Sequence, residues 1–484
     1  MISNNIKKIT SPLIGLICLW LSIHAYANPL KLSLEEAIML AIRDNPNVQQ
    51  SRLNYVLQKF NREVQEWQFQ PHYAIDAAGT MARTKSNGET QSTHRYSISP
   101  NATLLTPFGT QVTLSATNNI ITSYQPGLSL EILQPLLRGF GRPIVEAALY
   151  NTRDNEKIAK LNVEAALRAT VTNVINAYLD VVSAQHTIRI DEDAVKRAAK
   201  SVEQTHLFIK AGRKAGNELI TVQANLASAR AKLESDRNAL KQSGYALLTA
   251  IGLNPNLDTT FTSIDIPKLI KKYPKPALQQ AKTSALSNDI QYQIDQITLH
   301  GSTTRALLLA EDGTRWQLNF NANAGIGSGL SGQQNTGGLT SLIDGQNQVE
   351  GASLTLKIPL NDKMAKQAVL NAKVALQEAE IALRQEKWNK ETNAINSYNS
   401  IASTARTLSF SEEAEQLQNK TYELNFQKYL HGLIDSLELQ SAQLQLIQSQ
   451  QATLSSRISY LKSLINMDLL MGHTLKTWSI EVRV

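Results

Sequence analysis

Two carboxylates close to the end of the chain have the spacing of a site that could act on ions. Asp435 and Glu438 stand three residues apart just after a glycine turn, and residues three apart share one face of a helix. A pair of acids on one face can attract cations. Two hydrated acids at the positive end of a helix dipole explain the pair equally well, so the residues alone leave both interpretations open. Glu218 follows an earlier glycine turn in the same way.

Enzyme chemistry has less support in the sequence. No His-Glu-x-x-His zinc signature is present, the 8 histidines are scattered, and Cys18 is the only cysteine. The glycine cluster at residues 325–329 lacks the spacing of a phosphate-binding loop and opens no helical pattern. We therefore expect a protein that is not an enzyme and that needs neither a cofactor nor a metal.

Long helices must position these acids. A seven-residue apolar repeat runs through residues 174–209 and again through residues 219–247, and a less regular one runs through residues 437–465. Such a repeat keeps one seam facing a partner helix and predicts coiled-coil packing. Residues 144–209 contain neither proline nor glycine, which allows a helix of about 100 Å at a rise of 1.5 Å per residue.

Two glycine turns separate the long helices. The first turn contains Gly212, Arg213 and Lys214, and the second contains Gly432 and Leu433. Glycine adopts the left-handed conformation that ends a helix, so each turn is expected to form the tip of an antiparallel helical hairpin.

The chain reads as two copies of one unit. Four short stretches of the first half resemble stretches of the second half in the same order: 34–45 and 278–289, 134–136 and 358–360, 148–153 and 368–373, 218–223 and 435–440. The offset between the copies falls from 244 to 224 residues between the first two matches. The first copy therefore holds about 20 extra residues before Gln134. The four matches in the same order are typical of internal duplication.

The repeat divides the chain into segments. The first copy covers residues 28–254, with a helix at 33–67, strands within 71–134 and long helices at 144–209 and 218–250. A linker follows at residues 255–276. The second copy covers residues 277–471, with a helix at 277–310, strands within 314–360 and long helices at 362–430 and 434–470. Residues 472–484 form a C-terminal tail.

Four segments alternate apolar and polar residues, which indicates strands with one apolar and one polar face. They are residues 72–78, 127–132, 315–322 and 353–358. The extra residues of the first copy, 95–105 and 110–117, are typical of an added hairpin whose place the sequence leaves open. Four strands cannot close a barrel, and an open sheet leaves unpaired edges, so several copies of the chain are expected to share one sheet.

The first residues predict export. Lys7 and Lys8 precede an apolar run at residues 12–23, and Ala25-Tyr26-Ala27 is an A-x-A cleavage site, so residues 1–27 are expected to be a signal peptide. No later stretch reaches the ~18–20 apolar residues of a transmembrane helix. An exported chain of this kind is either soluble or enters the outer membrane as a β-barrel.

Composition and charge agree with long helices rather than with nucleic-acid binding. Aromatic residues make up 6% and charged residues 18% of the chain. The formal net charge is +7, or +5 without Lys7 and Lys8, and no basic block is present. A mild excess spread along the chain gives no reason to expect a nucleic-acid partner.

Taken together, the mature chain resembles the TolC family of outer-membrane efflux and secretion channels. The resemblance is carried by the A-x-A signal, the strand–strand–long-hairpin unit written twice and the Leu/Gln-rich stretch after each turn. The junction sequence at residues 134–141, Gln-Pro-Leu-Leu-Arg-Gly-Phe-Gly, is similar to one found in part of the family. The resemblance implies a mainly α fold with a β part. It further implies a homotrimer with a 12-stranded outer-membrane barrel in lipid, continued by a hollow periplasmic cylinder of twelve long helices.

The same resemblance implies partners and site roles. Such channels carry drugs, other small molecules or secreted polypeptides to the exterior, together with a periplasmic adaptor and an inner-membrane transporter. Asp435 and Glu438, with Glu218 as their first-copy counterpart, would ring the periplasmic constriction. The tips at residues 212–214 and 432–433 would dock the adaptor. Phe426 and His431 stand near positions where a relative carries the Tyr and Arg of its gate latch, so this sequence departs from the family pattern there.

A periplasmic coiled-coil adaptor or a structural scaffold with no channel is the alternative. An adaptor usually has one hairpin beside a lipoyl-like β domain, whereas this chain has two hairpins of equal size with amphipathic strands before each. Both alternatives predict release without detergent.

Overall fold

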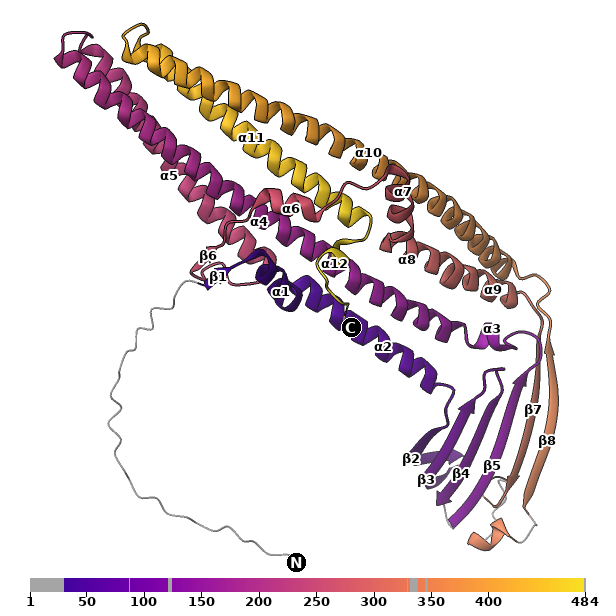
Figure 1. Ribbon diagram of the computed structural model, residues 1–484. Helices are drawn as coiled ribbons and strands as arrows, with labels where there is room; N and C mark the ends of the chain where they lie inside the picture. Colours follow the sequence, from indigo (N-terminus) through magenta and orange to yellow (C-terminus); the bar gives the residue numbers. More distant parts are fainter. Residues whose placement is uncertain are drawn as a thin grey trace, which may run out of the picture.

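A long helical body and a sheet at one of its ends make up the chain (Figure 1). The computed structural model describes residues 30–482, apart from 87, 121–123, 329, 331–337 and 344–346. The expected signal peptide and its cleavage site lie outside the described residues. No helix in the described part of the chain is both long and apolar enough to cross a membrane.

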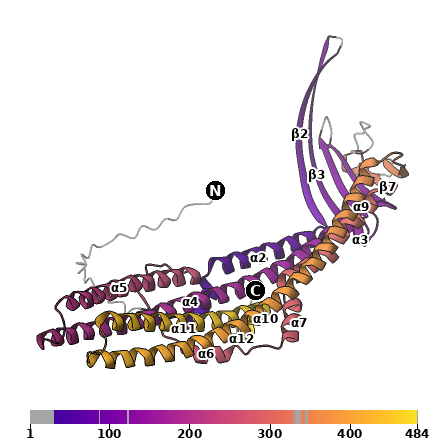
Figure 2. The same cartoon turned by 90° about the horizontal axis from the view of Figure 1, so that it is seen from above.

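Two helical hairpins run side by side through the body. α4 (Ala147–Lys210) and α5 (Asn217–Ile251) form the first, and α10 (Lys363–Leu430) and α11 (Ser436–Leu470) form the second. α4 has 64 residues and α10 has 68, whereas α5 and α11 have 35 each. Each long helix is therefore about 100 Å long and extends well beyond its shorter partner. The turns of both hairpins lie at the end opposite the sheet (Figures 1 and 2).

Shorter helices cover the remaining half of each long helix. α1 (Leu34–Asp44) and α2 (Pro46–Trp67) pack on α4. The single helix expected at residues 33–67 is wrong, because Pro46 disfavours a helical conformation at Asn45. Asn45 instead ends α1 and caps α2, and its side chain accepts a hydrogen bond of 2.9 Å from the amide of Asn47.

The helix expected at residues 277–310 is also broken. α7 (Leu278–Ser287) and α8 (Ile290–Thr298) are followed by a π-helical turn, η1 (Leu299–Thr303), and α9 (Thr304–Gly313). Asp289 caps α8 by accepting a hydrogen bond of 2.8 Å from the amide of Tyr292. The side-chain cap stabilises a new helix start and so interrupts the continuous pattern.

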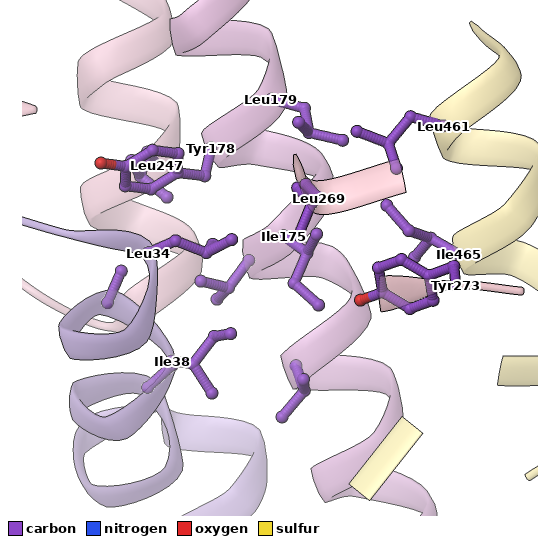
Figure 3. Close-up of a cluster of buried hydrophobic side chains, with 14 of the residues drawn as sticks. Leu34, Ile38, Ile175, Tyr178, Leu179, Leu247, Leu269, Tyr273, Leu461 and Ile465 are labelled. Atoms are coloured by element: carbon purple, nitrogen blue, oxygen red, sulfur yellow. The ribbon is translucent and has the colours of Figure 1, made fainter. Parts of the chain in front are cut away.

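The main core lies midway along the body, where both hairpins meet the short helices (Figure 3). A parallel pair of strands, β1 (Leu30–Leu32) and β6 (Thr259–Phe261), crosses this region beside α6 (Ile266–Lys272), and α12 (Thr474–Thr477) lies next to it. Tyr178 is fully buried, and its hydroxyl lies 2.9 Å from the carbonyl oxygen of Leu32 and 2.7 Å from that of Thr262. The hydroxyl of this α4 side chain thus links the ends of β1 and β6 to the core.

Six strands form one antiparallel sheet, in the order β2-β3-β4-β5-β7-β8. They are β2 (His72–Ser86), β3 (Glu89–Leu105), β4 (Gln111–Ile120), β5 (Tyr124–Pro135), β7 (Gln317–Ile326) and β8 (Gln348–Lys357). The expectation of four strands is wrong, because the added segment of the first half supplies two complete strands of the same sheet. A short 3-10 helix, η2 (Gly338–Leu342), follows β7.

The turn between β3 and β4 explains how the added strands fit. It lies at the helical end of the sheet, where Gly141 donates a hydrogen bond to the carbonyl of Phe108. Gly109 has φ +94°, and a Cβ there would lie 2.8 Å from the carbonyl oxygen of Gly139. Only glycine combines that conformation with so close an approach. The added hairpin therefore closes next to α3 (Arg142–Val145) and does not extend an exterior loop.

A buried acid pair lies in the first hairpin. Asp191 of α4 is 3% exposed and faces Asp236 of α5, which accepts a hydrogen bond of 2.7 Å from Lys232. Burial raises the pKa of Asp191 to about 7, and the neighbouring Asp236 carboxylate adds to the shift. Between pH ~4 and ~7 the folded chain keeps a proton that the unfolded chain loses, so this group destabilises the fold as pH rises through that window.

We predict that Asp191→Asn stabilises the hairpin increasingly as pH rises. The asparagine amide cannot ionise, so the difference in unfolding midpoint between variant and wild type should grow from pH 4 and level off above about pH 7. Thermal unfolding in detergent, followed by circular dichroism, measures this difference. Asp193→Asn, at an exposed acid of the same helix, is the control and should show no such growth. A difference that does not depend on pH would contradict the prediction.

Candidate functional site

The strand register gathers apolar side chains on one face of the sheet. Residues directly opposite each other in the register point to the same face of the sheet. Ile75 and Pro100 therefore share one face, and the same rule assigns residues of the following strands to that face. Twelve large apolar side chains of this face are between 38% and 80% exposed in the single chain. They are Tyr73, Ile75, Tyr96, Ile98, Leu114, Ile120, Tyr124, Leu128, Leu130, Phe320, Leu354 and Leu356.

The opposite face is polar and mostly uncharged. Asn101 donates a hydrogen bond of 2.7 Å to Asp76, and the hydroxyls of Ser115 and Ser129 lie 2.7 Å apart. The other polar side chains of this face include Ser97, Ser99, Thr113, Thr117, Glu131, Asn321, Asn323, Ser353 and Thr355. A sheet with these two faces can separate lipid on one side from water on the other.

Each lateral side of the chain has an end strand of the sheet and a helix with exposed apolar side chains. β2 and β8 are the end strands of the sheet, and each pairs with one neighbour among the described residues. α2 leads into β2 and exposes an apolar stripe, and α10 follows β8 and exposes another. The first stripe is Leu53, Leu57, Phe60, Val64 and Trp67, and the second is Val374, Ile381 and Trp388. Spacings of three, four and seven residues on a helix are those of a coiled-coil seam without its partner.

The hairpin turns adopt the conformation that their glycines permit. Gly212 has φ +67° and Gly432 has φ +75°. The two turns are neighbours, since a Cβ on Gly432 would lie 3.7 Å from the guanidinium of Arg213. Arg213 is exposed, and Leu433 is 73% exposed.

Asp435 and Glu438 are both exposed at the start of α11. The Asp435 carboxylate caps the helix by accepting a hydrogen bond of 2.8 Å from the amide of Glu438. In the described part of the chain neither acid forms an ion pair, whereas Glu218 pairs with Lys214 at 2.8 Å. The two acids of the second turn thus keep their charge free, and the acid of the first turn does not.

Lys214 is turned inward, against the expectation that it forms part of an outer tip. Its side chain is 7% exposed, its ammonium lies 4.3 Å from the centre of the Tyr429 ring, and it donates to the carbonyl of Ile434 at 3.4 Å. The ion pair with Glu218 and the aromatic ring together compensate the buried charge. Lys214 therefore ties the first turn to the second.

A buried hydroxyl pair beneath the turns was not foreseen from the sequence. Tyr429 of α10 and Thr205 of α4 are fully buried, and their hydroxyl oxygens lie 2.6 Å apart. Thr205 donates to the carbonyl of Ser201 at 2.7 Å, so Tyr429 is the donor to Thr205. Tyr422 and Phe426 precede Tyr429 at helical spacing, and Arg197 and Lys200 of α4 lie over their rings. That spacing was visible in the sequence, but the facing helix was not.

No group of three or more His, Cys, Asp or Glu side chains in the described ranges could hold a metal ion.

Comparison with known proteins relates this arrangement to membrane channels. The family model described as "Outer membrane efflux protein" matches residues 313–473. No curated protein sequence matches the chain.

Solved structures match over 91% of the chain. The CmeC outer membrane channel of Campylobacter jejuni is 14% identical with 85% of its chain covered and a TM-score of 0.66. The open state of the MtrE outer membrane channel of Neisseria gonorrhoeae is 14% identical, with 88% covered and a TM-score of 0.68. The outer membrane protein VceC of Vibrio cholerae is 15% identical, with 95% covered and a TM-score of 0.63. The resemblance expected from the sequence is therefore confirmed: the chain carries an outer membrane efflux protein domain in its second half and has the fold of outer-membrane channels.

Proposed function

We propose that copies of this chain close into a ring that forms an outer-membrane channel continued by a periplasmic tube. The observation that carries the proposal is the open six-stranded sheet, apolar on one face, polar on the other and unpaired at both edges. In lipid, unpaired backbone groups at a sheet edge are too costly to persist. Pairing β2 of one copy with β8 of the next removes every edge when the ring closes.

The helices support the same closure. The α2 stripe lies on the β2 side and the α10 stripe on the β8 side, because each helix is directly joined to its strand. Head-to-tail contact between these two different surfaces generates a ring if the rotation closes. The stripe residues would then complete a coiled-coil seam between neighbouring copies.

Three copies is the number that the resemblance implies. A homotrimer of this chain would have eighteen strands, since each chain contributes six. The twelve strands expected from the sequence assumed four per chain and are corrected accordingly. Eighteen is an even number within the range of outer-membrane barrels, and barrels of 16–18 strands leave a water-filled lumen.

The helical tube supports a route for transported substrates. Its helices of about 100 Å would extend far into the periplasm. The exposed turn residues Gly212, Arg213, Gly432 and Leu433 are the proposed contacts for a periplasmic adaptor, which would join the channel to an inner-membrane transporter. Lys214 is not included among the proposed adaptor contacts, because Tyr429 and Glu218 cover its side chain.

An adaptor or a scaffold is a weaker explanation of the same chain. A protein that stays in the periplasm gains nothing from a sheet with a dozen exposed apolar side chains on one face. Lipid contact accounts for that face directly.

The free acids of the second turn are proposed to form the narrow periplasmic end. In a closed ring each copy brings one Asp435 and one Glu438 toward the axis, and a ring of carboxylates attracts cations and repels anions. Glu218 is a weaker candidate for this constriction because Lys214 neutralises it.

Opening would require the two hairpins of each chain to separate at their tips. Tyr429, Thr205 and Lys214 hold the hairpins together there. We propose that this contact serves as the latch, in place of one formed by Phe426 and His431. Phe426 lies in the same buried cluster, whereas His431 is exposed at the turn.

Cysteine cross-linking tests the closure. Ile75→Cys on β2, combined in separate variants with cysteine at Ala352, Leu354 or Leu356 on the same face of β8, should give covalent oligomers on oxidation. Three β8 positions are needed because a disulfide forms only when the Cα atoms are ~4.4–6.8 Å apart. Electrophoresis of outer-membrane fractions without reductant should show a ladder ending at three copies.

The matched control pairs Ile75→Cys with Leu130→Cys, on a central strand of the same face. It should stay monomeric under oxidation. Three results would contradict the proposed channel. They are a ladder from this control, no ladder from any of the three edge pairs, and extraction of the wild type without detergent. Replacing Cys18, the only native cysteine, by serine removes any ambiguity.

Ion selectivity tests the constriction. Asp435→Asn combined with Glu438→Gln removes two negative charges per copy, so the cation-over-anion permeability ratio in planar bilayers should fall at least about two-fold at low salt. Glu413→Gln, at an exposed acid about three quarters of the way along α10, is the control and should retain the wild-type ratio. An unchanged ratio in the double variant would assign these acids to the hydrated surface.

Channel opening tests the latch. Tyr429→Phe removes a buried hydrogen bond of about 1 kcal/mol, so the open-to-closed ratio should rise roughly five-fold per chain. Single-channel recordings measure the open fraction, and Thr205→Val should have the same effect. Tyr422→Phe, in the same aromatic cluster, should leave it unchanged. Equal open fractions in all variants would show that the hydroxyl pair only packs the helices.

A further inference from the structure

The first two strands of the sheet extend beyond the others. β2 pairs with β3 along its full length, but β3 pairs with β4 only between Tyr96 and Leu105. Residues 80–86 and 89–95 therefore form a two-stranded ribbon of seven residue pairs without a third strand. At ~3.3 Å per residue the ribbon projects about 20 Å past the rest of the sheet, away from the helices (Figure 2).

Charges on this ribbon are sorted by face. Arg83 and Lys85 point to the apolar side of the sheet, opposite Ser92 and Thr90 in the register, and His94 stands opposite Met81 on the same side. Glu89 and Arg95 belong to the other side, because their register partners are Ser86 and Thr80. The side that continues the apolar face thus carries two exposed permanent cations and no acid.

Two tyrosines lie near the exterior end of the apolar face. Tyr96, Ile120 and Tyr124 lie directly opposite one another across three strands. Aromatic side chains at such a level are typical of the boundary between hydrocarbon and headgroups. From Tyr73 to Met81 the apolar stretch of β2 spans about 26 Å along the strand, or about 20 Å of membrane depth at a tilt of about 40°, which fits within the ~25 Å apolar band of outer-membrane strands.

The cations lie just past this boundary. Arg83 follows Gly79, the register partner of Tyr96, by four residues, or about 13 Å along a strand that tilts in the membrane. Long cationic side chains reach back toward the interface by several ångströms. Arg83 and Lys85 would therefore stand at the level of the headgroups on the lipid side.

We propose that the outer face of this ribbon, through Arg83 and Lys85, binds the phosphate groups of phosphorylated glycolipids in the outer leaflet. The inference rests on the proposed channel, because the orientation of the ribbon follows from lipid contact along the apolar face. A guanidinium binds phosphate through paired hydrogen bonds and an ammonium binds it as a point charge, so the two side chains suit a phosphorylated headgroup. The ribbon thereby anchors the exterior edge of the sheet to its surrounding lipid.

Lipid binding by the assembled full-length chain tests the proposal. The probe is a bisphosphorylated lipid A in detergent micelles, titrated against wild type, Arg83→Gln/Lys85→Gln and Arg95→Gln at 50 and 500 mM NaCl. Each lost cation should weaken binding roughly five-fold at low salt. Arg95→Gln removes a cation of the same ribbon from the opposite face and should bind like wild type. Wild-type affinity should fall at high salt, as expected for charge pairing.

Three outcomes would overturn the proposal. They are wild-type affinity in the double variant, equal binding of dephosphorylated lipid A, and displacement of the lipid by millimolar inorganic phosphate, which would indicate a general anion surface. Cross-linking of Ile75→Cys with the β8 cysteines, repeated in the double variant, separates this failure from failure of the channel. A normal ladder with unchanged lipid binding rejects only the ribbon site, whereas loss of the ladder in otherwise wild-type protein rejects the channel.

Discussion

Backbone hydrogen bonding at the edges of the sheet is the constraint on which the rest depends. β2 and β8 each leave a row of amides and carbonyls unpaired, and the face beside them is apolar. In the proposed channel, lipid would exclude the water that otherwise satisfies those groups, so the sheet would be complete only as part of a ring. Hydrogen bonds at the junction between the sheet and the helices couple the two parts. Gly139 donates to Asp312 at 2.8 Å, and Arg305 of α9 donates to Asp154 of α4. Closure of the strands in the proposed ring would therefore fix the positions of the helices.

Sequence periodicity indicated the parts of the fold that depend on local pattern. The heptads of residues 174–209 and 219–247 lie in helices of 64 and 35 residues, and the glycines of both turns have positive φ. Capping was harder to foresee, because an Asn or Asp competes with the helix only when its side chain finds an amide, as Asn45 and Asp289 do. The number of strands was missed because the residues around Pro107 and Gly109 read as an insertion. Their fit against Gly139 depends on a contact remote in sequence.

The candidate site residues also differ in whether local pattern or contacts remote in sequence determine their surroundings. The chain position of Asp435 and Glu438 was readable, since a helix start after a glycine turn is a local feature. The contacts of Lys214 with Ile434 and of Tyr429 with Thr205 were not, because they join the two hairpins across more than 200 residues of sequence. A lysine beside a turn glycine looks hydrated until a second helix covers it. Pairings between hairpins require the register of the bundle, which heptads in one helix leave undetermined.

The two additional strands would also set the proportions of the proposed assembly. Six strands spaced by about 4.8 Å and tilted by about 40° occupy roughly 38 Å of circumference. The helical part of each chain has four columns: α4, α10, α5 continued by α2, and α11 continued by α7 to α9. At about 10 Å per helix these columns occupy roughly 40 Å. Four strands would span only about 25 Å and narrow the mouth into a funnel, whereas the wider sheet would give the proposed ring a conduit whose walls stay parallel from the periplasm to the outside.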